Sequence, residues 1–381
     1  MERSNKTKIA IFVPWIKSKG GVERTILRFI EDKKYEWDIY TFFYDKNKTF
    51  QEFQKFNVIL IGQAKTEGFF AKGINLFLKL IFTKIENIED YDIFIVSTAG
   101  IAEFITFRNK NKKTIALCHT PLRVAHTMYE YYKNQSLRNK LTLPIIIPFY
   151  RKLEKMAWKR INYAIVLSQE VKKRIIQYQL LKENKIFNIG PSVNYSKIKN
   201  KNIKTKKIIF YPSRFIRYKR QDLAVKAFNL SGISKRGFKL IIAGFVEDEE
   251  YFKEVKSMEN ESISVVGNIT EEKLNEIYSN CYATLFLAIN EDTGLTPLES
   301  LAYGKPVISV NEGGPTEFIK NEVNGLLVNA DEKDIADALK NITNKKLYNK
   351  LKNGAKKSKR YDERNSIKKI DQAIDEIIKK V

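Results

Sequence analysis

The stretch that most constrains the fold is residues 284–317, which read TLFLAINEDTGLTPLESLAYGKPVISVNEGGPTE. It contains two apolar runs, 284–289 and 306–310, each short enough for a buried strand. A polar loop at 290–295 and a helix that starts at Thr296-Pro297 separate the two runs, and a Gly-Gly-Pro turn is predicted to open another helix. Strand, loop, helix and strand in this order form a βαβ unit, which predicts a parallel sheet.

Two carboxylates in this unit are candidate ligand-binding groups. Glu291 lies in the loop and Glu299 in the first turn of the helix, both on the side where open α/β sheets bind ligands. Carboxylates supply acceptors for sugar hydroxyls, and the neighbouring helix N-terminus favours anions, so the arrangement suits a phosphorylated sugar. The alternative for Glu299 is structural, because Thr296, Pro297 and Glu299 fit a capping box with Thr at the N-cap.

The rest of the chain alternates between strand-like and helical patterns. This alternation predicts an α/β protein with doubly wound parallel sheets. A chain of 381 residues is long for one domain, so two are expected. The polar, lysine-rich segment that begins at 190–192 is the predicted linker, which places one domain at 1–192 and the other at 205–361. The remaining strand-like runs are residues 8–15, 38–44, 57–61, 91–97, 113–118, 162–168, 207–211, 238–243 and 262–266.

The charge balance points to an anionic partner. There are 68 Lys and Arg residues against 44 Asp and Glu, a formal net charge of +24. Phosphates, nucleic acid and acidic lipid all fit this excess, and genomic bias toward lysine is an alternative source of part of it.

Cys118 and Cys281 show no pairing or metal-binding pattern, which fits a reducing cytosol. We find no secretory signal and no run of about 18 apolar residues, so a cytoplasmic location is expected.

A basic loop follows the run at 207–211. Arg214 and Lys219 lie in it, five positions apart. Two fixed cations at a strand end can offset the charge of a diphosphate without a metal, although a solvated basic loop is the alternative. An Asp-x-Asp metal motif near a strand end is absent, so we predict no metal site and no cofactor.

Both histidines of the chain fall in one segment, CHTPLRVAHTMYEYY, which begins at Cys118. His119 directly follows a predicted strand, at the carboxyl edge of the sheet. His126 and Arg123 are close to it in sequence, together with several tyrosines. This concentration of polar and aromatic side chains favours a binding site over a structural role.

Two segments combine apolar and basic residues, as a helix lying on a membrane surface does. One is 68–88, for which an ordinary core-facing helix is the alternative. The other is 137–160, where Pro144 and Pro148 predict that no long helix forms. Its apolar part is interpreted as a loop that touches lipid, on the side of the protein where an acceptor substrate would bind. Peripheral attachment to the anionic cytoplasmic face of the membrane is therefore an expectation.

Several of these sequence motifs together resemble those of the GT4 family of retaining glycosyltransferases. The resemblance covers most of the chain and is strongest from 205 to 330. The E-x7-E spacing of Glu291 and Glu299 carries the resemblance, with GLTPLE, GKPVI and GGPTE around it. The R-x4-K spacing of Arg214 and Lys219, the H-x-P-x-R segment from His119, and GGVER after the first strand agree with it. The resemblance implies the GT-B fold, in which two Rossmann-like domains face a cleft and the last helix, here 362–381, packs back on the first domain.

The resemblance also implies roles for residues. Arg214 and Lys219 would bind the donor diphosphate, Glu291 and His119 would contact the sugar, and these four are the catalytic candidates. Glu299 would bind the ribose, and Arg123 would lie on the acceptor side. The remaining donor-binding candidates are backbone positions: Gly20, Gly21, Gly267, Asn268, Ile269, Gly294, Leu295 and Thr296.

The expected activity is transfer of a hexose, mannose or glucose, from a nucleotide-diphosphate sugar to a glycan or lipid-linked glycan, with retention at the anomeric carbon. No general base for a double displacement is evident, so a same-face mechanism is favoured. One alternative is a nucleotide-sugar epimerase on the same fold, which the E-x7-E spacing argues against. The other is a basic nucleic-acid-binding protein, but the basic residues are dispersed and no nucleic-acid motif is recognised.

Overall fold

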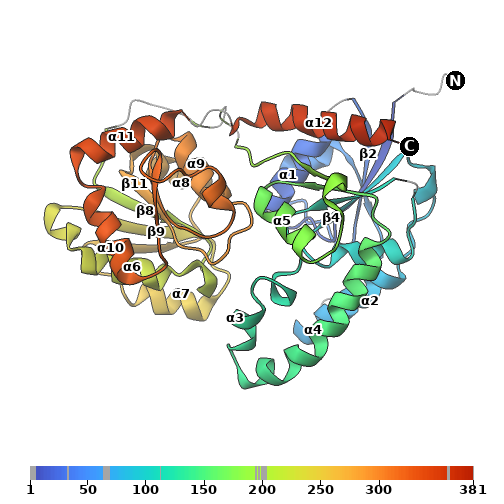
Figure 1. Ribbon diagram of the computed structural model, residues 1–381, viewed down its shortest axis with the longest axis horizontal. Coiled ribbons are helices and arrows are strands. Elements are labelled where there is room, and N and C mark those ends of the chain that lie inside the picture. The colour runs from blue at the N-terminus through green and yellow to red at the C-terminus, as the bar shows by residue number, and fades with distance from the viewer. Residues whose placement is uncertain are drawn as a thin grey trace. The chain divides into compact units, whose positions relative to one another are not determined.

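The computed structural model describes residues 6–31, 34–62, 69–111, 113–193, 195, 198, 204–357 and 361–380, with side chains from residue 75 onward in the helix that begins at Phe69. The chain forms two compact units (Figure 1). Unit 1 consists of Met1–Gly190 and Ile367–Val381, and unit 2 of Pro191–Ser366. The sequence-based boundaries, 1–192 and 205–361 with a returning helix at 362–381, lie close to these.

Unit 1 is built on a seven-stranded parallel sheet in the order β3-β2-β1-β4-β5-β6-β7. Successive residues of β1 alternate between the two faces, because side chains of a strand point to opposite sides. Ile9 and Ile11 join one hydrophobic cluster, whereas Ala10 and Phe12 join another. The strands are β1 Lys8–Phe12, β2 Glu36–Thr41, β3 Asn57–Leu60, β4 Ile93–Thr98, β5 Thr114–Cys118, β6 Tyr163–Val166 and β7 Ile186–Asn188.

Helices cover both faces of this sheet. On one face, α1 (Gly21–Ile30) and the last helix α12 (Glu363–Lys379) bury their apolar stripes in the same cluster. Asp375 of α12 also accepts hydrogen bonds from Lys34 and Tyr35. On the other face lie α2 (Phe69–Phe82), α4 (Leu137–Trp158) and α5 (Gln169–Gln177), after the short α3 (Tyr129–Lys133).

The prediction that Pro144 and Pro148 prevent a long helix was wrong. Both prolines lie inside α4, which is continuous over 22 residues, so the apolar segment there is a helix and not a loop. Both also lie on exposed turns of the helix. Water can therefore hydrogen-bond the carbonyls that the prolines leave without a helical N–H partner, which keeps the local cost of each proline low.

Unit 2 contains a six-stranded parallel sheet in the order β10-β9-β8-β11-β12-β13. Its strands are β8 Ile208–Pro212, β9 Lys239–Gly244, β10 Ile263–Gly267, β11 Ala283–Phe286, β12 Val307–Val310 and β13 Gly325–Val328. Its helices are α6 Gln221–Ser231, α7 Glu249–Lys256, α8 Glu271–Asn280, α9 Leu295–Ala302, α10 Glu332–Asn341 and α11 Lys345–Lys356. Two strands, β7 and β13, were not predicted, because three or four residues at a sheet edge leave little pattern to recognise.

The helix after β11 begins differently from the prediction. Gly294, in a left-handed conformation with φ of 82°, is the N-cap of α9, and no side chain caps the helix. Thr296 and Pro297 therefore lie inside the first turn, so the capping box assigned to Thr296 and Glu299 was wrong. The turn after Gly313 is only a short 3₁₀ segment, Gly314–Glu317, and not a further α-helix.

Within the described part of the chain, none of the helices has both the length and the apolar character that crossing a bilayer requires.

Candidate active site

The carboxyl edge of the unit 2 sheet brings together the two motifs on which the site prediction rests, R-x4-K and E-x7-E. Strands β8 and β11 are neighbours in the sheet, and the strand order reverses between them. Arg214 and Lys219 follow β8, and Glu291 follows β11. Parallel strands end at the same edge, so both loops emerge side by side at the position where open α/β sheets bind ligands.

Lys219 and Glu291 form an ion pair at this edge. Lys219 Nζ lies 2.5 Å from Glu291 Oε2, and the two side chains are 9% and 20% exposed. The lysine ammonium also lies 5.3 Å from the ring centroid of Phe286, the last residue of β11. Tyr211, buried in β8, donates its hydroxyl hydrogen to Lys219 O and accepts one from Leu287 N. This tyrosine therefore ties the two loops together beneath the ion pair.

The backbone around Glu291 is fixed by two glycines of the next loop. Gly313 has φ of 67°, and a Cβ there would lie 2.3 Å from Glu291 O. Gly314 N donates to the same carbonyl at 2.8 Å. Only glycine tolerates both this φ and this close approach, so the GGPTE word has a steric function beneath the loop that carries Glu291.

Arg214 lies farther out in the loop after β8. Its guanidinium pairs with Glu247, which follows β9, and Nη2 donates to Tyr218 Oη at 3.2 Å. Gln221 holds the backbone of Arg214 by donating to its carbonyl at 2.7 Å. The Arg214 side chain is 53% exposed, so its charge is presented to solvent at the carboxyl edge.

Glu299 lies in the second turn of α9 and is contacted by a buried tyrosine of α8. Tyr278 Oη lies 3.3 Å from Glu299 Oε2 and 3.3 Å from Thr296 O. Burial keeps the pKa of Tyr278 well above its ordinary value, so this hydroxyl stays protonated and can donate. Gly294 packs against Pro315, where an added Cβ would come within 2.6 Å of Cγ. The first turn of α9, with Leu295 and Thr296, thus rests on the GGPTE loop.

The turn Gly267-Asn268-Ile269 follows β10 at the same edge. Asn268 has φ of 51° and its backbone N–H donates to Gly244 O at 2.8 Å. Its side-chain oxygen accepts from Val246 N at 3.1 Å. The turn is therefore fastened to the end of β9.

In unit 1, His119 follows β5 at the carboxyl edge of its own sheet. Its Nε2 lies 3.0 Å from Ser97 Oγ, at the end of the neighbouring strand β4. Burial lowers the pKa of His119 to about 4, so the ring is neutral at physiological pH. A neutral imidazole can exchange hydrogen bonds with a hydroxyl group but does not supply a positive charge. Arg123 lies in the short 3₁₀ turn Arg123–Ala125 and is partly buried.

Gly20 and Gly21 lie where the sequence placed them, at the start of α1. Gly20 is the N-cap and Gly21 the first helical residue. The buried carboxylate of Glu23 folds back over this start, accepting from Ser18 Oγ at 2.7 Å. An added Cβ on Gly20 would lie 2.7 Å from Glu23 Oε2, so the glycine allows the carboxylate to approach.

The two histidines, expected together in one site, have different surroundings. His126 Nε2 lies 2.7 Å from Glu154 Oε2 of α4, and its ring stacks on Tyr178 at 3.9 Å. Tyr150 links Glu154 to Glu103, a second fully buried carboxylate. Burial, and then the nearby Glu154, raise the pKa of Glu103 to about 7. His126 therefore belongs to a buried cluster that joins α4 to the loop after β5.

Several contacts at the candidate site were not predicted, namely those made by Glu247, Tyr218, Tyr278 and Glu312. Glu312 accepts hydrogen bonds from Arg220 at 3.3 Å and from Asn290 N at 3.1 Å. Glu247 comes three residues after Gly244, which ends β9, so its place after a strand was a usable signal. The pairing of Glu247 with Arg214 could not be predicted, because it depends on how neighbouring strands align in the sheet.

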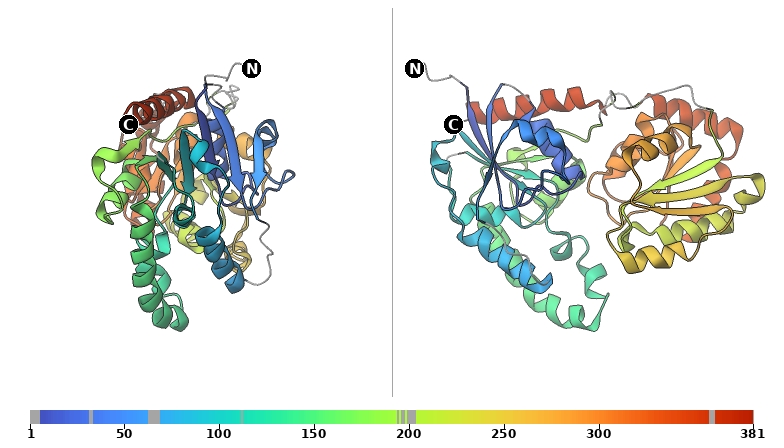
Figure 2. Two further views of the ribbon diagram at one scale, coloured as in Figure 1. Left: turned by 90° about the vertical axis from the view of Figure 1, so that its right-hand side faces the viewer. Right: turned by 180° about the vertical axis from the view of Figure 1, so that it is seen from behind.

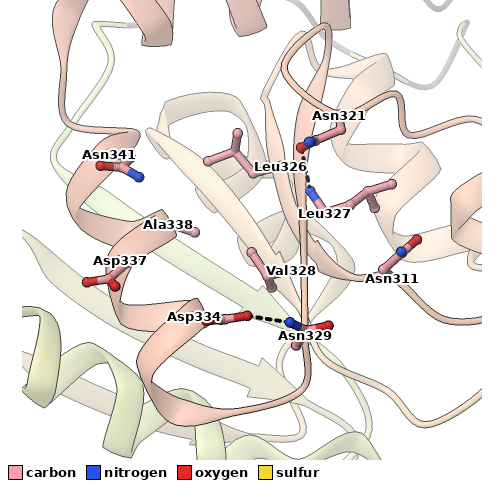
Figure 3. Close-up of a pocket in the computed structure, with 10 residues that line it drawn as sticks. All are labelled: Asn311, Asn321, Leu326, Leu327, Val328, Asn329, Asp334, Asp337, Ala338 and Asn341. Carbon is pink, nitrogen blue, oxygen red and sulfur yellow. Dashed lines mark hydrogen bonds between the residues drawn. The ribbon is translucent and has the colours of Figure 1, made fainter.

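A separate hollow lies between β13 and α10 (Figure 3). Asn329 Nδ2 donates to Asp334 at 2.6 Å, and Leu327 N donates to Asn321 Oδ1 at 3.0 Å, so these polar groups stabilise local turns. None of the candidate site residues lines this hollow. Across the residues that the structure describes, no group of three or more His, Cys, Asp or Glu side chains is placed to hold a metal ion.

Comparisons with known proteins agree with this geometry. Residues 194–358 match the family model of the glycosyl transferases group 1. The chain is 26% identical over 327 residues to the alpha-1,3/1,6-mannosyltransferase ALG2 of Dictyostelium discoideum, covering 77% of this chain and 76% of the relative. To the mouse protein of the same name it is 24% identical, over 86% of this chain and 85% of that one.

Solved structures show the same fold. A glycosyltransferase from Rickettsia africae aligns with a TM-score of 0.73 and 19% identity, over 99% of this chain and all of that chain. HepE of Anabaena, solved with UDP-glucose, aligns with a TM-score of 0.72 and 16% identity, over 97% and 99% of the two chains. The predicted α/β class and GT-B fold are thereby confirmed. Residues 194–358 thus carry a domain of the glycosyl transferases group 1 family, and the chain as a whole is similar to GT4-type glycosyltransferases in sequence and fold.

Proposed function

We propose that this glycosyltransferase moves a hexose from a nucleotide-diphosphate sugar to a glycan or lipid-linked glycan, with retention at the anomeric carbon. The observation that carries the proposal is the ion pair of Lys219 and Glu291 at the carboxyl edge between β8 and β11. A single sugar phosphate could therefore contact both side chains, with its phosphate on the lysine and a sugar hydroxyl on the carboxylate.

The donor diphosphate binds Arg214 and Lys219, beside the N-terminus of α9. These cations stabilise the charge that develops on the leaving diphosphate, and removal of one such preorganised donor typically costs about 3–4 kcal/mol in the transition state. Glu299 accepts a hydrogen bond from the ribose. The turn at Gly267, Asn268 and Ile269 lies against the base.

The hexose is held by Glu291 and by the backbone at Gly294 and Leu295. Mannose and glucose are the candidate sugars. Relatives named as mannosyltransferases and a fold neighbour solved with UDP-glucose support this choice.

In the chemical step, the bond between the anomeric carbon and the diphosphate oxygen breaks, and its electron pair stays on the diphosphate. The acceptor hydroxyl forms the new bond on the same face, and its proton passes to the departing phosphate oxygen. Lys219 and Arg214 serve this step as fixed charges, and no metal takes part. His119, being neutral, hydrogen-bonds the sugar, and Arg123 lies on the acceptor side.

The acceptor side is proposed to rest on an anionic membrane surface through α4. An apolar stripe runs along this helix with a spacing of four residues, at Leu137, Leu141, Ile145 and Phe149. Ile145 is 76% and Phe149 is 64% exposed, and a contiguous row of exposed apolar side chains is typical of an interaction surface. The N-terminal half of α4 extends away from the sheet of unit 1 (Figures 1 and 2).

Exposed cations flank the stripe, namely Arg138, Lys140, Lys152, Lys155 and Lys159. Apolar side chains bordered by lysine and arginine are the pattern of helices that lie in the lipid headgroup region. Charge complementarity therefore favours anionic phospholipid over a neutral surface. Attachment here would hold the enzyme at the surface where a lipid-linked acceptor is found.

The donor site is tested by calorimetric titration of UDP, GDP and ADP without metal. We expect one nucleotide to bind the wild type, with affinity about 10- to 100-fold lower in Arg214→Ala, because a hydrogen bond to a charged group is worth about 1.5–3 kcal/mol. The matched control is Arg217→Ala in the same loop, since Arg217 pairs with Glu254 at 2.8 Å and has no assigned role at the site.

Turnover tests the chemistry. Hexose transfer in the presence of EDTA, with an NMR measurement showing the donor's anomeric configuration in the product, would support the proposal. An inverted product would contradict the same-face mechanism, and loss of activity in EDTA would contradict metal independence. If no nucleotide binds the wild type, the donor site itself is wrong.

A further inference from the structure

Each cation of the proposed diphosphate site already has a carboxylate partner. Lys219 pairs with Glu291, and Arg214 pairs with Glu247. Two positive and two negative side chains leave the site without the surplus charge that a diphosphate needs. A carboxylate and a phosphate oxygen bind the same N–H groups of these cations, so the donor diphosphate competes with the two carboxylates for them.

Glu291 is poorly placed to give way. Its side chain is 20% exposed, and its partner Lys219 is 9% exposed. Its backbone is held by Gly314, which donates to Glu291 O at 2.8 Å. Moving this carboxylate would leave a nearly buried ammonium without its partner, which costs free energy.

Glu247 is placed differently. It lies between the end of β9 and the start of α7, and its side chain is 37% exposed. The next residue, Asp248, caps α7 by accepting from Tyr251 N at 2.9 Å, so the backbone stays fixed while the Glu247 side chain can turn toward water. An exposed ion pair of this kind contributes little free energy and is readily exchanged for a stronger partner.

We propose that Glu247 occupies the donor-phosphate position on Arg214 in the nucleotide-free enzyme and competes with the diphosphate for it. This inference rests on the proposed function, since it assigns a role within that donor site. Together with Tyr218, whose Oη lies 3.2 Å from Arg214 Nη2, Glu247 holds the guanidinium in place between turnovers. It lowers the affinity for the nucleotide and, by taking Arg214 back, speeds release of the nucleoside diphosphate product.

The test compares Glu247→Gln with Glu254→Gln. The second variant is the matched control, because Glu254 makes the same kind of exposed pair with Arg217, at 2.8 Å, in the same region of unit 2. UDP, GDP and ADP are titrated without metal into both variants and the wild type. For the nucleotide that binds, we expect about three- to ten-fold higher affinity in Glu247→Gln, and a change below about two-fold in Glu254→Gln.

A second readout is product inhibition during turnover. The inhibition constant of the nucleoside diphosphate should fall in Glu247→Gln by the same factor as the dissociation constant, with slower dissociation in stopped-flow measurements. Equal affinities in the two glutamine variants, or weaker binding in Glu247→Gln, would overturn the proposal while the donor site stands. Binding to none of the three proteins would overturn the donor site and this proposal together.

Discussion

Lys219 Nζ lies 2.5 Å from Glu291 Oε2, although 72 positions separate the two residues in the chain. The contact exists because β8 and β11 are neighbours in the sheet and both loops leave its carboxyl edge. It joins the cation assigned to the leaving diphosphate with the carboxylate assigned to the sugar.

Replacing Lys219 by Ala should lower kcat by about 10²- to 10³-fold, because a fixed charge that stabilises the leaving group is lost. Steady-state kinetics with the nucleotide sugar measure the change. The control is Lys226→Ala, whose ammonium makes an exposed pair with Asp222 at 3.5 Å on α6 and should leave kcat nearly unchanged. A kcat within about three-fold of wild type in Lys219→Ala would remove this residue from the mechanism.

Replacing Gly313 by Ala should destabilise unit 2 and displace Glu291. The new Cβ would lie 2.3 Å from Glu291 O, in addition to the strain of φ at 67°. Gly232→Ala isolates the strain alone, because Gly232 has φ of 65° and nothing within 4 Å of the added Cβ. Thermal unfolding should show a loss of about 1 kcal/mol for Gly232→Ala and roughly 3 kcal/mol or more for Gly313→Ala. Equal losses would mean that the loop adjusts freely around the glycine.

Glu103→Gln should change how the stability of unit 1 depends on pH. The pKa of Glu103 is raised from 4.5 to about 7, so the folded state favours the protonated carboxyl. The stabilisation of the folded state by this protonated carboxyl is fully present below pH 4.5 and is lost as pH rises to about 7. In this range the unfolded state binds fewer protons than the folded state, so the free energy of unfolding falls with rising pH. Relative to Glu103→Gln, the wild type should lose about 2–4 kcal/mol between pH 4.5 and 8.

Urea unfolding followed by tryptophan fluorescence measures this difference, since all three tryptophans, Trp15, Trp37 and Trp158, lie in unit 1. The pH dependence of wild-type stability must be compared with that of Glu103→Gln, because other groups of the wild type also titrate in this range. His119 contributes in the opposite sense, because its lowered pKa makes the folded state less stable as pH falls from 6.5 to about 4. Parallel profiles for wild type and Glu103→Gln would show that folding does not raise the pKa of Glu103.

Ile145→Gln with Phe149→Gln should weaken binding to anionic vesicles about ten-fold or more, because two large exposed apolar side chains of α4 are replaced. Sedimentation with vesicles containing phosphatidylglycerol measures it. Leu230→Gln, at a 51% exposed leucine of unit 2, is the control and should bind like wild type. Unchanged binding in the α4 variant would eliminate this helix as a membrane-docking surface.

The sequence was sufficient to predict the parallel sheets and the sheet edge at which the candidate site residues lie. Alternation of apolar runs with helical segments is a local pattern, and parallel strands must end at a common edge. Arg214, Lys219 and Glu291 could therefore be placed after their strands from the chain alone. Glycines before helices were also readable, although the close contact of Gly313 with Glu291 O was not.

Tertiary structure decided what each of these side chains contacts. The sequence treated Pro144 and Pro148 as helix breakers, but α4 is continuous, and both prolines lie on exposed turns where water can hydrogen-bond the carbonyls. It treated Thr296 as a cap, but packing of Gly294 on Pro315 begins α9 two residues earlier. The pairing of Arg214 with Glu247 depends on how far the loops after β8 and β9 extend. Local pattern thus determined which residues reach the edge, and packing between loops distant in the chain determined their partners, because ion pairs and buried polar contacts form in three dimensions.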